Sequence, residues 1–336
     1  MKIDRFSWAG LLALALLASC GGGGAPSSSS PPPVVVTPPP APSSLGDFPD
    51  PFVLADQGAY YAYATNAQGR HVQLARSSDL HAWSAQPDAM PTLARWVRTG
   101  SPNVWAPEVA HIGSSYVLYY TAHDDASGRQ CVGAAVSAAP SGPFVDNANA
   151  PLVCQVEEGG TIDPSPLASG GKLYLYFKSD GNCCHLPTRI FAQELRADGL
   201  AVVGSPVALL TNERTWEGAV IEAPTMFAKD GRFLLFYSAN DYAGAAYATG
   251  YAVCSGPLGP CERAPDSPIL VSRATEPKLI GPGHQAVFQV GDQTWIAYHA
   301  WEELAGGAQG NRRFMYIDKL DWVDGRPVVR GPTMVP

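Results

Sequence analysis

The chain has 336 residues, and 46% of them are apolar, including eight tryptophans, which is enough to form a large hydrophobic core. The formal net charge is −8 at pH 7. This charge argues against nucleic acid and strongly anionic ligands, because a protein needs Lys and Arg to contact phosphate. A neutral ligand fits the composition better.

Residues 1–20 have the pattern of a bacterial lipoprotein export signal. Two basic residues near the start precede an apolar run over residues 11–17, and residues 17–20 resemble the lipobox, whose cysteine becomes the lipidated first residue. The apolar run is too short to span a bilayer core of about 30 Å. We therefore predict export, lipidation at Cys20, and membrane attachment through that lipid alone. Ordinary cleavage nearby is the alternative.

Residues 21–46 are rich in Gly, Ser and Pro, so they predict a tether rather than a folded unit. Residues 47–336 follow without a second break of this kind. All-β folds often reach this size as one unit. We expect a single catalytic domain that acts as a monomer.

Six cysteines remain apart from the lipobox cysteine, and an even number in an exported chain suggests disulfides. A metal-thiolate site is the alternative, although no CxxC spacing supports it. The predicted pairs are Cys254 with Cys261 across a Gly- and Pro-rich turn, Cys131 with Cys154, and, as the remainder, the adjacent Cys183 with Cys184.

One phrase recurs five times: a Pro-containing apolar step, a polar turn with Gly or Asp, and an aromatic strand. Each phrase predicts two short strands joined by a tight turn, and no stretch shows convincing helical periodicity. Five units of nearly 60 residues with about four strands each predict an all-β, five-bladed β-propeller. A solenoid is the alternative, with usually shorter repeats. The markers Pro51, Pro107, Pro164, Pro224 and Gln285 are spaced by 56, 57, 60 and 61 residues.

Asp50, Asp163 and Glu222 stand at the beginning of the first, third and fourth repeats. The first strand of each propeller blade lines the central channel, so these side chains should meet at the axis. Hydrolysis of a glycosidic bond needs two carboxyl groups in opposite protonation states. A third carboxylate nearby can raise the pKa of the proton donor. Three axial carboxylates therefore predict a glycoside hydrolase.

Six motifs lie in order at residues 48–51, 105–109, 161–164, 221–224, 281–284 and 298–300. Through these motifs, the sequence from Asp47 onward resembles glycoside hydrolase family 43. The resemblance implies that Asp50 is the general base, that Glu222 is the general acid, and that Asp163 orients the acid and holds its pKa up, with inversion at the anomeric carbon.

The resemblance also concerns ligands near the axis. His284 is similar to a near-axial histidine that in some members contacts a structural calcium or another ion through water. Arg313 resembles an arginine that approaches the sugar or Asp50, although the adjacent Arg312 leaves the registration open. No cofactor is required by this chemistry, and a structural Ca²⁺ at the axis is the ion that the resemblance suggests.

Aromatic side chains stack on sugar faces, so Phe48, Trp105 and Trp216 are candidate platforms, with core packing as the alternative for each. Glu217 and Glu158 are rivals of Glu222 for the acid role. Glu108 is interpreted as a polar structural residue. His299 is either a site residue or a core histidine.

The motifs at residues 159–165, 178–182 and 247–252 look like an exo-arabinofuranosidase branch of the family. We therefore predict an inverting, exo-acting α-L-arabinofuranosidase that releases L-arabinose from arabinan or arabino-oligosaccharides of plant cell walls. A β-xylosidase and an endo-1,5-arabinanase are the alternatives. A non-catalytic surface glycan-binding propeller would not need the intact carboxylates. A retaining fructan hydrolase would need an Asn-Asp-Pro-Asn type motif, which Asp50 does not have around it.

Overall fold

The computed structural model describes residues 45–275 and 278–332. The predicted signal, the lipidation site at Cys20 and nearly all of the predicted tether lie outside the described residues. Within the described part, no helix is both long and apolar enough for a membrane crossing.

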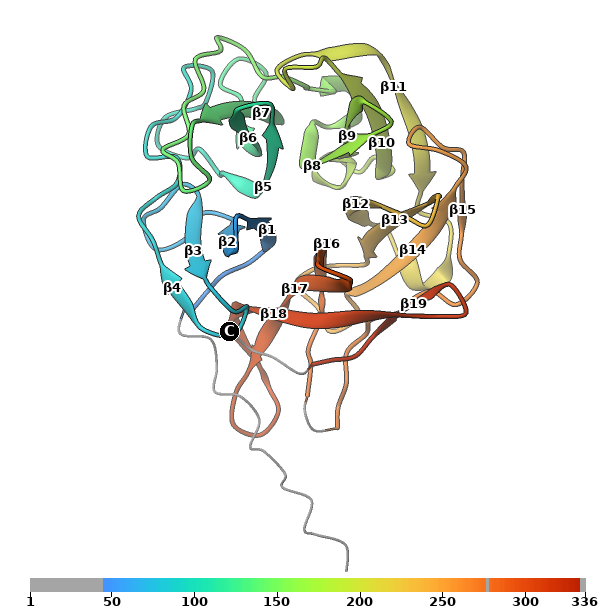
Figure 1. Ribbon diagram of the computed structural model, residues 1–336. Coiled ribbons are helices and arrows are strands. Elements are labelled where there is room, and N and C mark those ends of the chain that lie inside the picture. The colour runs from blue at the N-terminus through green and yellow to red at the C-terminus, as the bar shows by residue number, and fades with distance from the viewer. Residues whose placement is uncertain (1–44, 276–277, 333–336) are drawn as a thin grey trace, which may run out of the picture. The chain divides into compact units, whose positions relative to one another are not determined.

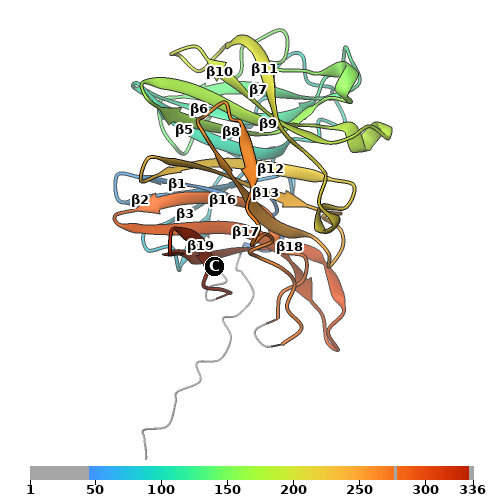
Figure 2. The same ribbon diagram turned by 90° about the vertical axis from the view of Figure 1, so that its right-hand side faces the viewer.

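Five antiparallel sheets surround a central axis, as Figure 1 shows along that axis, so the predicted five-bladed β-propeller is confirmed. Figure 2 shows the strands running between the two faces of the ring. Blade one holds β1 (Phe52–Asp56), β2 (Ala59–Ala64), β3 (Gln73–Ser77) and β4 (Trp83–Ala85); blade two holds β5 (Trp105–Ile112), β6 (Ser115–His123) and β7 (Gln130–Ser137). Blade three holds β8 (Thr161–Ser169), β9 (Lys172–Ser179), β10 (Arg189–Leu195) and β11 (Val202–Thr211); blade four holds β12 (Ile221–Lys229), β13 (Arg232–Ala239), β14 (Ala248–Cys254) and β15 (Cys261–Arg263). Blade five holds β16 (Gly283–Val290), β17 (Gln293–Glu303), β18 (Gln309–Val323) and β19 (Arg326–Val329).

The hydrophobic core lies between neighbouring blades. One buried cluster fills each of the five boundaries, and the second strand of every blade contributes a fully buried tyrosine. These tyrosines come from the aromatic strands of the repeated phrase: Tyr63, Tyr119, Tyr176, Tyr237 and Tyr298. Burial of the aromatic strand therefore explains why the same phrase recurs in every unit.

Blade two has three strands instead of four. The position of a fourth strand is taken by a segment that pairs with β7 through the isolated bridges Val136 to Val145 and Val132 to Val153 and is joined to it by the Cys131–Cys154 disulfide. This segment contains Pro140, Pro143 and Pro151. Each of these prolines lacks an N–H donor, which weakens regular pairing with β7.

The segment before β1 closes the ring against blade five. The Phe48 N–H donates to the Arg313 carbonyl oxygen at 2.8 Å, and the Arg313 N–H donates to Asp47 Oδ1 at 2.7 Å. The Phe48 side chain is only 2% exposed and lies in a cluster with Met315 of β18. Phe48 is thus a core residue, and it is not available as a sugar platform.

All six cysteines of the propeller form disulfides, in the predicted pairs. The bonds join Cys131 to Cys154, Cys183 to Cys184, and Cys254 to Cys261. The metal-thiolate alternative is therefore wrong. Among the described residues, the one acidic and sulfur cluster with metal-like spacing includes Cys131 and Cys154, whose sulfurs are already bonded.

Candidate active site

A shared backbone feature opens the inner strand of each blade. One residue there has a positive φ of 44–56°, and in blades two to five a register shift follows it. Such bulges turn a side chain away from its regular strand direction and are frequent beside active sites. The five residues are Asp50, Ala106, Asp163, Ala223 and His284. Asp50, Asp163 and His284 therefore occupy the same step of three blades, whereas Glu222 comes one residue earlier in its own blade.

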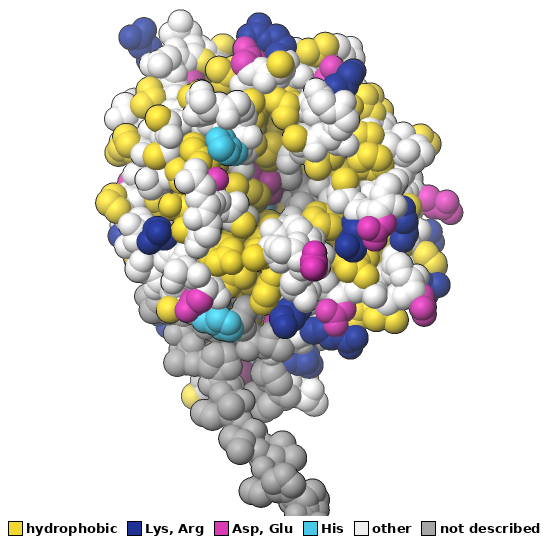
Figure 3. Space-filling model, in the orientation of Figure 1, with side chains coloured by type: hydrophobic (Ala, Val, Ile, Leu, Met, Phe, Trp, Pro, Cys, Tyr) yellow, Lys and Arg dark blue, Asp and Glu magenta, His cyan; other side chains and the backbone are white. Residues whose placement is uncertain are grey.

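The antiparallel order places the start of every inner strand on one face of the ring, where a pocket of about 330 Å³ opens. Figure 3 shows the hollowed centre of the molecule, with acidic side chains inside it. The pocket is lined by Asp50, Thr65, Trp105, Ile162, Asp163, Lys178, Asp180, Asn182, Cys183, Glu222, Tyr242, His284 and Arg313. It thus brings together all three predicted catalytic carboxyl groups and three of the five predicted sugar-binding residues.

Trp216 does not reach the pocket. It stacks on Tyr237 with 5.6 Å between ring centroids, and it packs against Gly250, where a Cβ would collide with its ring. The alternative of core packing therefore holds for Trp216, as it does for Phe48, and Trp105 is the predicted platform that does line the pocket.

Asp50 is surrounded by donors and positive charge. Its Oδ1 lies 3.1 Å from Arg313 Nη1, 3.1 Å from His299 Nδ1 and 3.3 Å from His284 Nδ1, and Thr65 donates to its Oδ2 at 2.5 Å. Burial by itself would raise the pKa of Asp50, but the charges of Arg313 and His284 outweigh it and hold the pKa well below its usual range. Asp50 is therefore a carboxylate at neutral pH, as a general base must be.

Two aromatic rings hold Arg313 in place. Its guanidinium lies 5.1 Å from the ring centroid of Tyr242 and 5.6 Å from that of Trp301. Cation–π contacts of this kind fix the direction of the side chain. Arg312 instead pairs with Glu302. Arg313 is thus the arginine that faces Asp50, and the registration left open in the sequence is resolved.

Glu222 sits between an ammonium group and a phenol. Lys178 Nζ, which is fully buried on β9, donates to Glu222 Oε2 at 2.9 Å, and the Tyr247 hydroxyl donates to Oε1 at 2.7 Å. Burial would raise the pKa of Glu222, but the charges of Lys178 and His284 outweigh it and lower that pKa. Lys178 therefore favours the ionised form of Glu222.

Asp163 has the opposite tendency. Its Oδ2 accepts the Ala223 N–H at 2.9 Å. Burial raises the pKa of Asp163, and the charge of Glu222 adds to the rise against the opposing charges of His284 and Lys178. Interacting carboxyl groups take up protons as a pair. Burial therefore favours the protonated form of Asp163, whereas Lys178 favours the ionised form of Glu222.

Lys178→Met is expected to move the basic limb of the kcat/KM profile to higher pH. The ammonium group lowers the pKa of Glu222, so its removal raises that pKa, and a proton-donating Glu222 then survives to higher pH. Lys172→Met is the control. Lys172 lies at the start of the same strand and pairs with Glu194, and neither residue lines the pocket. An unchanged basic limb in a folded Lys178→Met protein would contradict the role of this contact.

The rival acids lie outside the pocket. Glu217 is fully buried, but it accepts hydrogen bonds from the Tyr237 hydroxyl at 2.7 Å and Arg263 Nε at 2.6 Å. Glu158 pairs with Arg189 at 2.5 Å. Since neither carboxylate lines the pocket, each is assigned to a structural ion pair with its arginine.

Glu217→Ala should lower the free energy of unfolding by about 3–5 kcal/mol, because it leaves the Arg263 guanidinium without its buried partner. Hydrogen bonds to Glu217 lower its pKa against the effect of burial, so this stabilisation is present above the unfolded pKa and lost as the pH falls through the folded pKa. Urea unfolding measures the effect, with the exposed Glu262→Ala as control. Loss of kcat in the folded fraction would restore Glu217 as a candidate acid.

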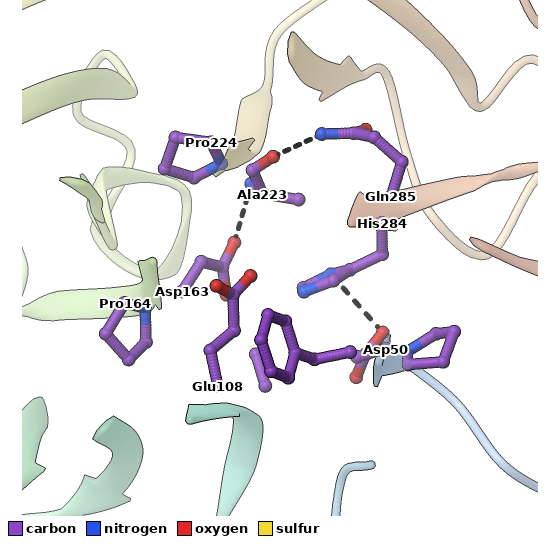
Figure 4. A pocket seen from close by; sticks show the side chains of 11 residues that line it. Asp50, Glu108, Asp163, Pro164, Ala223, Pro224, His284 and Gln285 are labelled. Atoms are coloured by element: carbon purple, nitrogen blue, oxygen red, sulfur yellow. Dashed lines mark hydrogen bonds and ion pairs between the residues drawn. The ribbon is translucent and has the colours of Figure 1, made fainter. Parts of the chain in front are cut away.

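A small closed cavity of about 10 Å³ lies at the axis beneath the pocket, and Figure 4 shows Asp50, Glu108, Asp163 and His284 around it. Burial raises the pKa of Glu108 to about 8, so this side chain is protonated at neutral pH. Carboxyl oxygens suit calcium, but calcium takes six to eight ligands, and this space holds about one water-sized particle. The small cavity alone does not hold a hydrated calcium ion, so the structural Ca²⁺ at the axis stays a prediction, and no step below involves a metal.

A five-bladed propeller with an ionised aspartate and two further buried carboxyl groups in one pocket has the parts of a glycoside hydrolase. The sequence pattern of glycosyl hydrolases family 43 matches residues 40–327, and the chain belongs to this family.

Similar proteins act on more than one polysaccharide, as their names state. Arabinan endo-1,5-alpha-L-arabinosidase C of Emericella nidulans is 26% identical, with 84% of this chain and 91% of the relative covered. A thermostable family-43 glycoside hydrolase of known structure matches with a TM-score of 0.78 at 30% identity, over 89% of this chain and 98% of that one. Endo-1,4-beta-xylanase from Bacteroides thetaiotaomicron matches with a TM-score of 0.74 at 28% identity, over 88% of this chain and 99% of that one.

Proposed function

We propose that the protein is an inverting, exo-acting α-L-arabinofuranosidase that releases L-arabinose from arabinan or arabino-oligosaccharides. The observation that carries the proposal is the contrast within one pocket between Asp50, whose pKa Arg313 and His284 hold low, and Asp163, whose pKa burial and the charge of Glu222 raise. Residues from all five blades line this pocket. The motifs at residues 159–165, 178–182 and 247–252, which resemble exo-arabinofuranosidases, support exo action. The arabinan-active relative supports the choice of sugar.

In the proposed reaction, Asp50 removes a proton from a water molecule, and the water oxygen attacks the anomeric carbon from the face opposite the leaving group. Glu222 gives its proton to the glycosidic oxygen as the bond breaks, so the sugar leaves with inverted configuration. Asp163 is a positioning residue, since its charge state controls the proton on Glu222. Arg313 keeps Asp50 ionised until it takes the proton from water.

The same proposal includes the cellular setting. Export with a lipid on Cys20 would hold a monomeric enzyme at the bacterial cell envelope, at the end of the Gly-, Ser- and Pro-rich tether. There it would meet oligosaccharides released from plant cell walls. Radiolabelled palmitate incorporation that is lost in Cys20→Ala is the expected result, and equal labelling of the variant would contradict the anchor.

The second candidate is endo-acting hydrolysis of arabinan, because the relative from Emericella nidulans carries that activity in its name. Xylan is the third substrate to test, because of the xylanase of similar structure.

The deciding experiment measures release of sugar from nitrophenyl α-L-arabinofuranoside, nitrophenyl β-D-xyloside and linear arabinan. Arabinose as the sole early product is expected. Mixed oligosaccharides would indicate endo action. Release of xylose would show that the enzyme acts on xylosides rather than on arabinofuranosides. NMR of the first product should show the inverted anomer, whereas a retained anomer would contradict the roles of Asp50 and Glu222.

A further inference from the structure

The disulfide between the adjacent Cys183 and Cys184 lies at the rim of the active-site pocket. The 3₁₀ helix η2 (Gly181–Cys184) carries it in the connection from β9 to β10, on the face where the inner strands begin. Cys183 is exposed and lines the pocket, together with the catalytic carboxyl groups. The other two disulfides do not line this pocket, so they have no comparable place.

Several contacts hold this disulfide in one position. Gly181 is buried, and a Cβ there would collide with the carbonyl oxygen of Pro187, so the turn is closely packed. From blade two, Arg129 Nη1 donates to Cys184 Sγ at 2.7 Å. A disulfide between neighbours also closes a ring through the peptide bond that joins them, which removes the side-chain rotations of both residues. The wall is therefore preformed, and a ligand would lose little entropy in ordering it.

The chemistry of this wall differs from that of the pocket floor. The floor presents Asp50, Asp163 and Glu222, which suit hydroxyl groups and the reacting bond. A disulfide has no hydrogen to donate, and its sulfurs are polarisable and weak acceptors, so it favours contact with C–H groups. Trp105 supplies a second apolar surface in the same pocket. A sugar ring has both kinds of surface, hydroxyl groups at its edges and C–H groups on its faces.

We propose that the Cys183–Cys184 disulfide is a rigid apolar contact surface for the C–H face of the sugar held in this pocket. The inference rests on the proposed function, because it assumes a glycoside ligand. It makes the disulfide a binding element rather than a support of the fold. Loss of the bond should therefore weaken sugar binding without a matching loss of stability.

The test uses the full domain in the Glu222→Gln background, so that bound sugar is not hydrolysed. Calorimetric titration with arabinobiose and with xylobiose gives the Kd of the parent. The double substitution Cys183→Ala/Cys184→Ala is then compared with Cys254→Ala/Cys261→Ala, which removes the disulfide at the outer edge of blade four. We expect Kd to rise about fivefold to tenfold in the first variant, the size of one lost apolar contact, and to stay unchanged in the second.

An unchanged Kd in a folded Cys183→Ala/Cys184→Ala protein would overturn the inference. Equal weakening in both double variants would overturn it too, since the effect would then follow from general loosening. In the enzyme with Glu222 intact, the first variant should raise KM while kcat stays within about twofold. If the parent binds xylobiose but not arabinobiose, the proposed sugar is corrected to xylose. The comparison of the two double variants then tests the disulfide surface with xylobiose. Binding of neither sugar by the parent would contradict the proposed function itself, before any cysteine is changed.

Discussion

Asp50→Asn is expected to lower kcat on arabinan by about 10³-fold, within the range of 10² to 10⁴ for removal of a general base or acid. The amide cannot take a proton from water, and it leaves Arg313 and His284 without the negative charge that they now face. KM should change little, because the loss falls on the chemical step. Initial rates on linear arabinan from pH 4 to 9 measure the effect.

Asp230→Asn is a matched control for this variant. Asp230 has a φ of 51° against 56° for Asp50, so both positions accept asparagine equally well in backbone terms. It lies in the exposed turn between β12 and β13, away from the pocket. Activity of Asp50→Asn within tenfold of the control would rule out Asp50 as the base.

Glu222→Gln should lower kcat on arabinan by about 10³-fold but affect nitrophenyl substrates much less. A sugar leaving group must be protonated as it departs, whereas nitrophenolate leaves without a proton. The variant should also lose the basic limb of the pH profile, which Lys178 places by lowering the pKa of Glu222. Glu262→Gln, an exposed carboxylate on β15, is the control.

Asp163→Asn separates the two members of the carboxyl pair. If Asp163 positions the proton and Glu222 delivers it, Asp163→Asn lowers the rate more on arabinan than on nitrophenyl substrates, in the same direction as Glu222→Gln but less strongly. The raised pKa of Asp163 makes this comparison necessary, since burial favours the protonated form of Asp163 as well. If the loss of rate depends on the leaving group in Asp163→Asn but not in Glu222→Gln, Asp163 is the proton donor and Glu222 is the positioning residue.

The missed pocket residues left weaker signals in the sequence. Lys178 follows the apolar and aromatic run of residues 173–177 and begins the motif at residues 178–182, but the motif was interpreted only as a hint of the substrate. Tyr247 begins the motif at residues 247–252 in the same way, and Tyr242 is one of many tyrosines with no signal of its own. His299 is fully buried and faces Asp50, and burial lowers its pKa to about 4, so it is the neutral neighbour of an ionised base.

The amino-acid sequence by itself determined the five repeats and the strand pair that opens each of them, and it predicted the three disulfides, because these depend on local patterns and short spacings. It also placed Asp50, Asp163 and Glu222 near one axis, since a repeat brings equivalent positions together. The charge state of each carboxyl group was decided only by the tertiary structure. Lys178 and Arg313 reach their partners across 44 and 263 residues, and a pKa depends on distance in space. The burial of Phe48 likewise follows from closure of the ring, which joins the first described residues to the last blade.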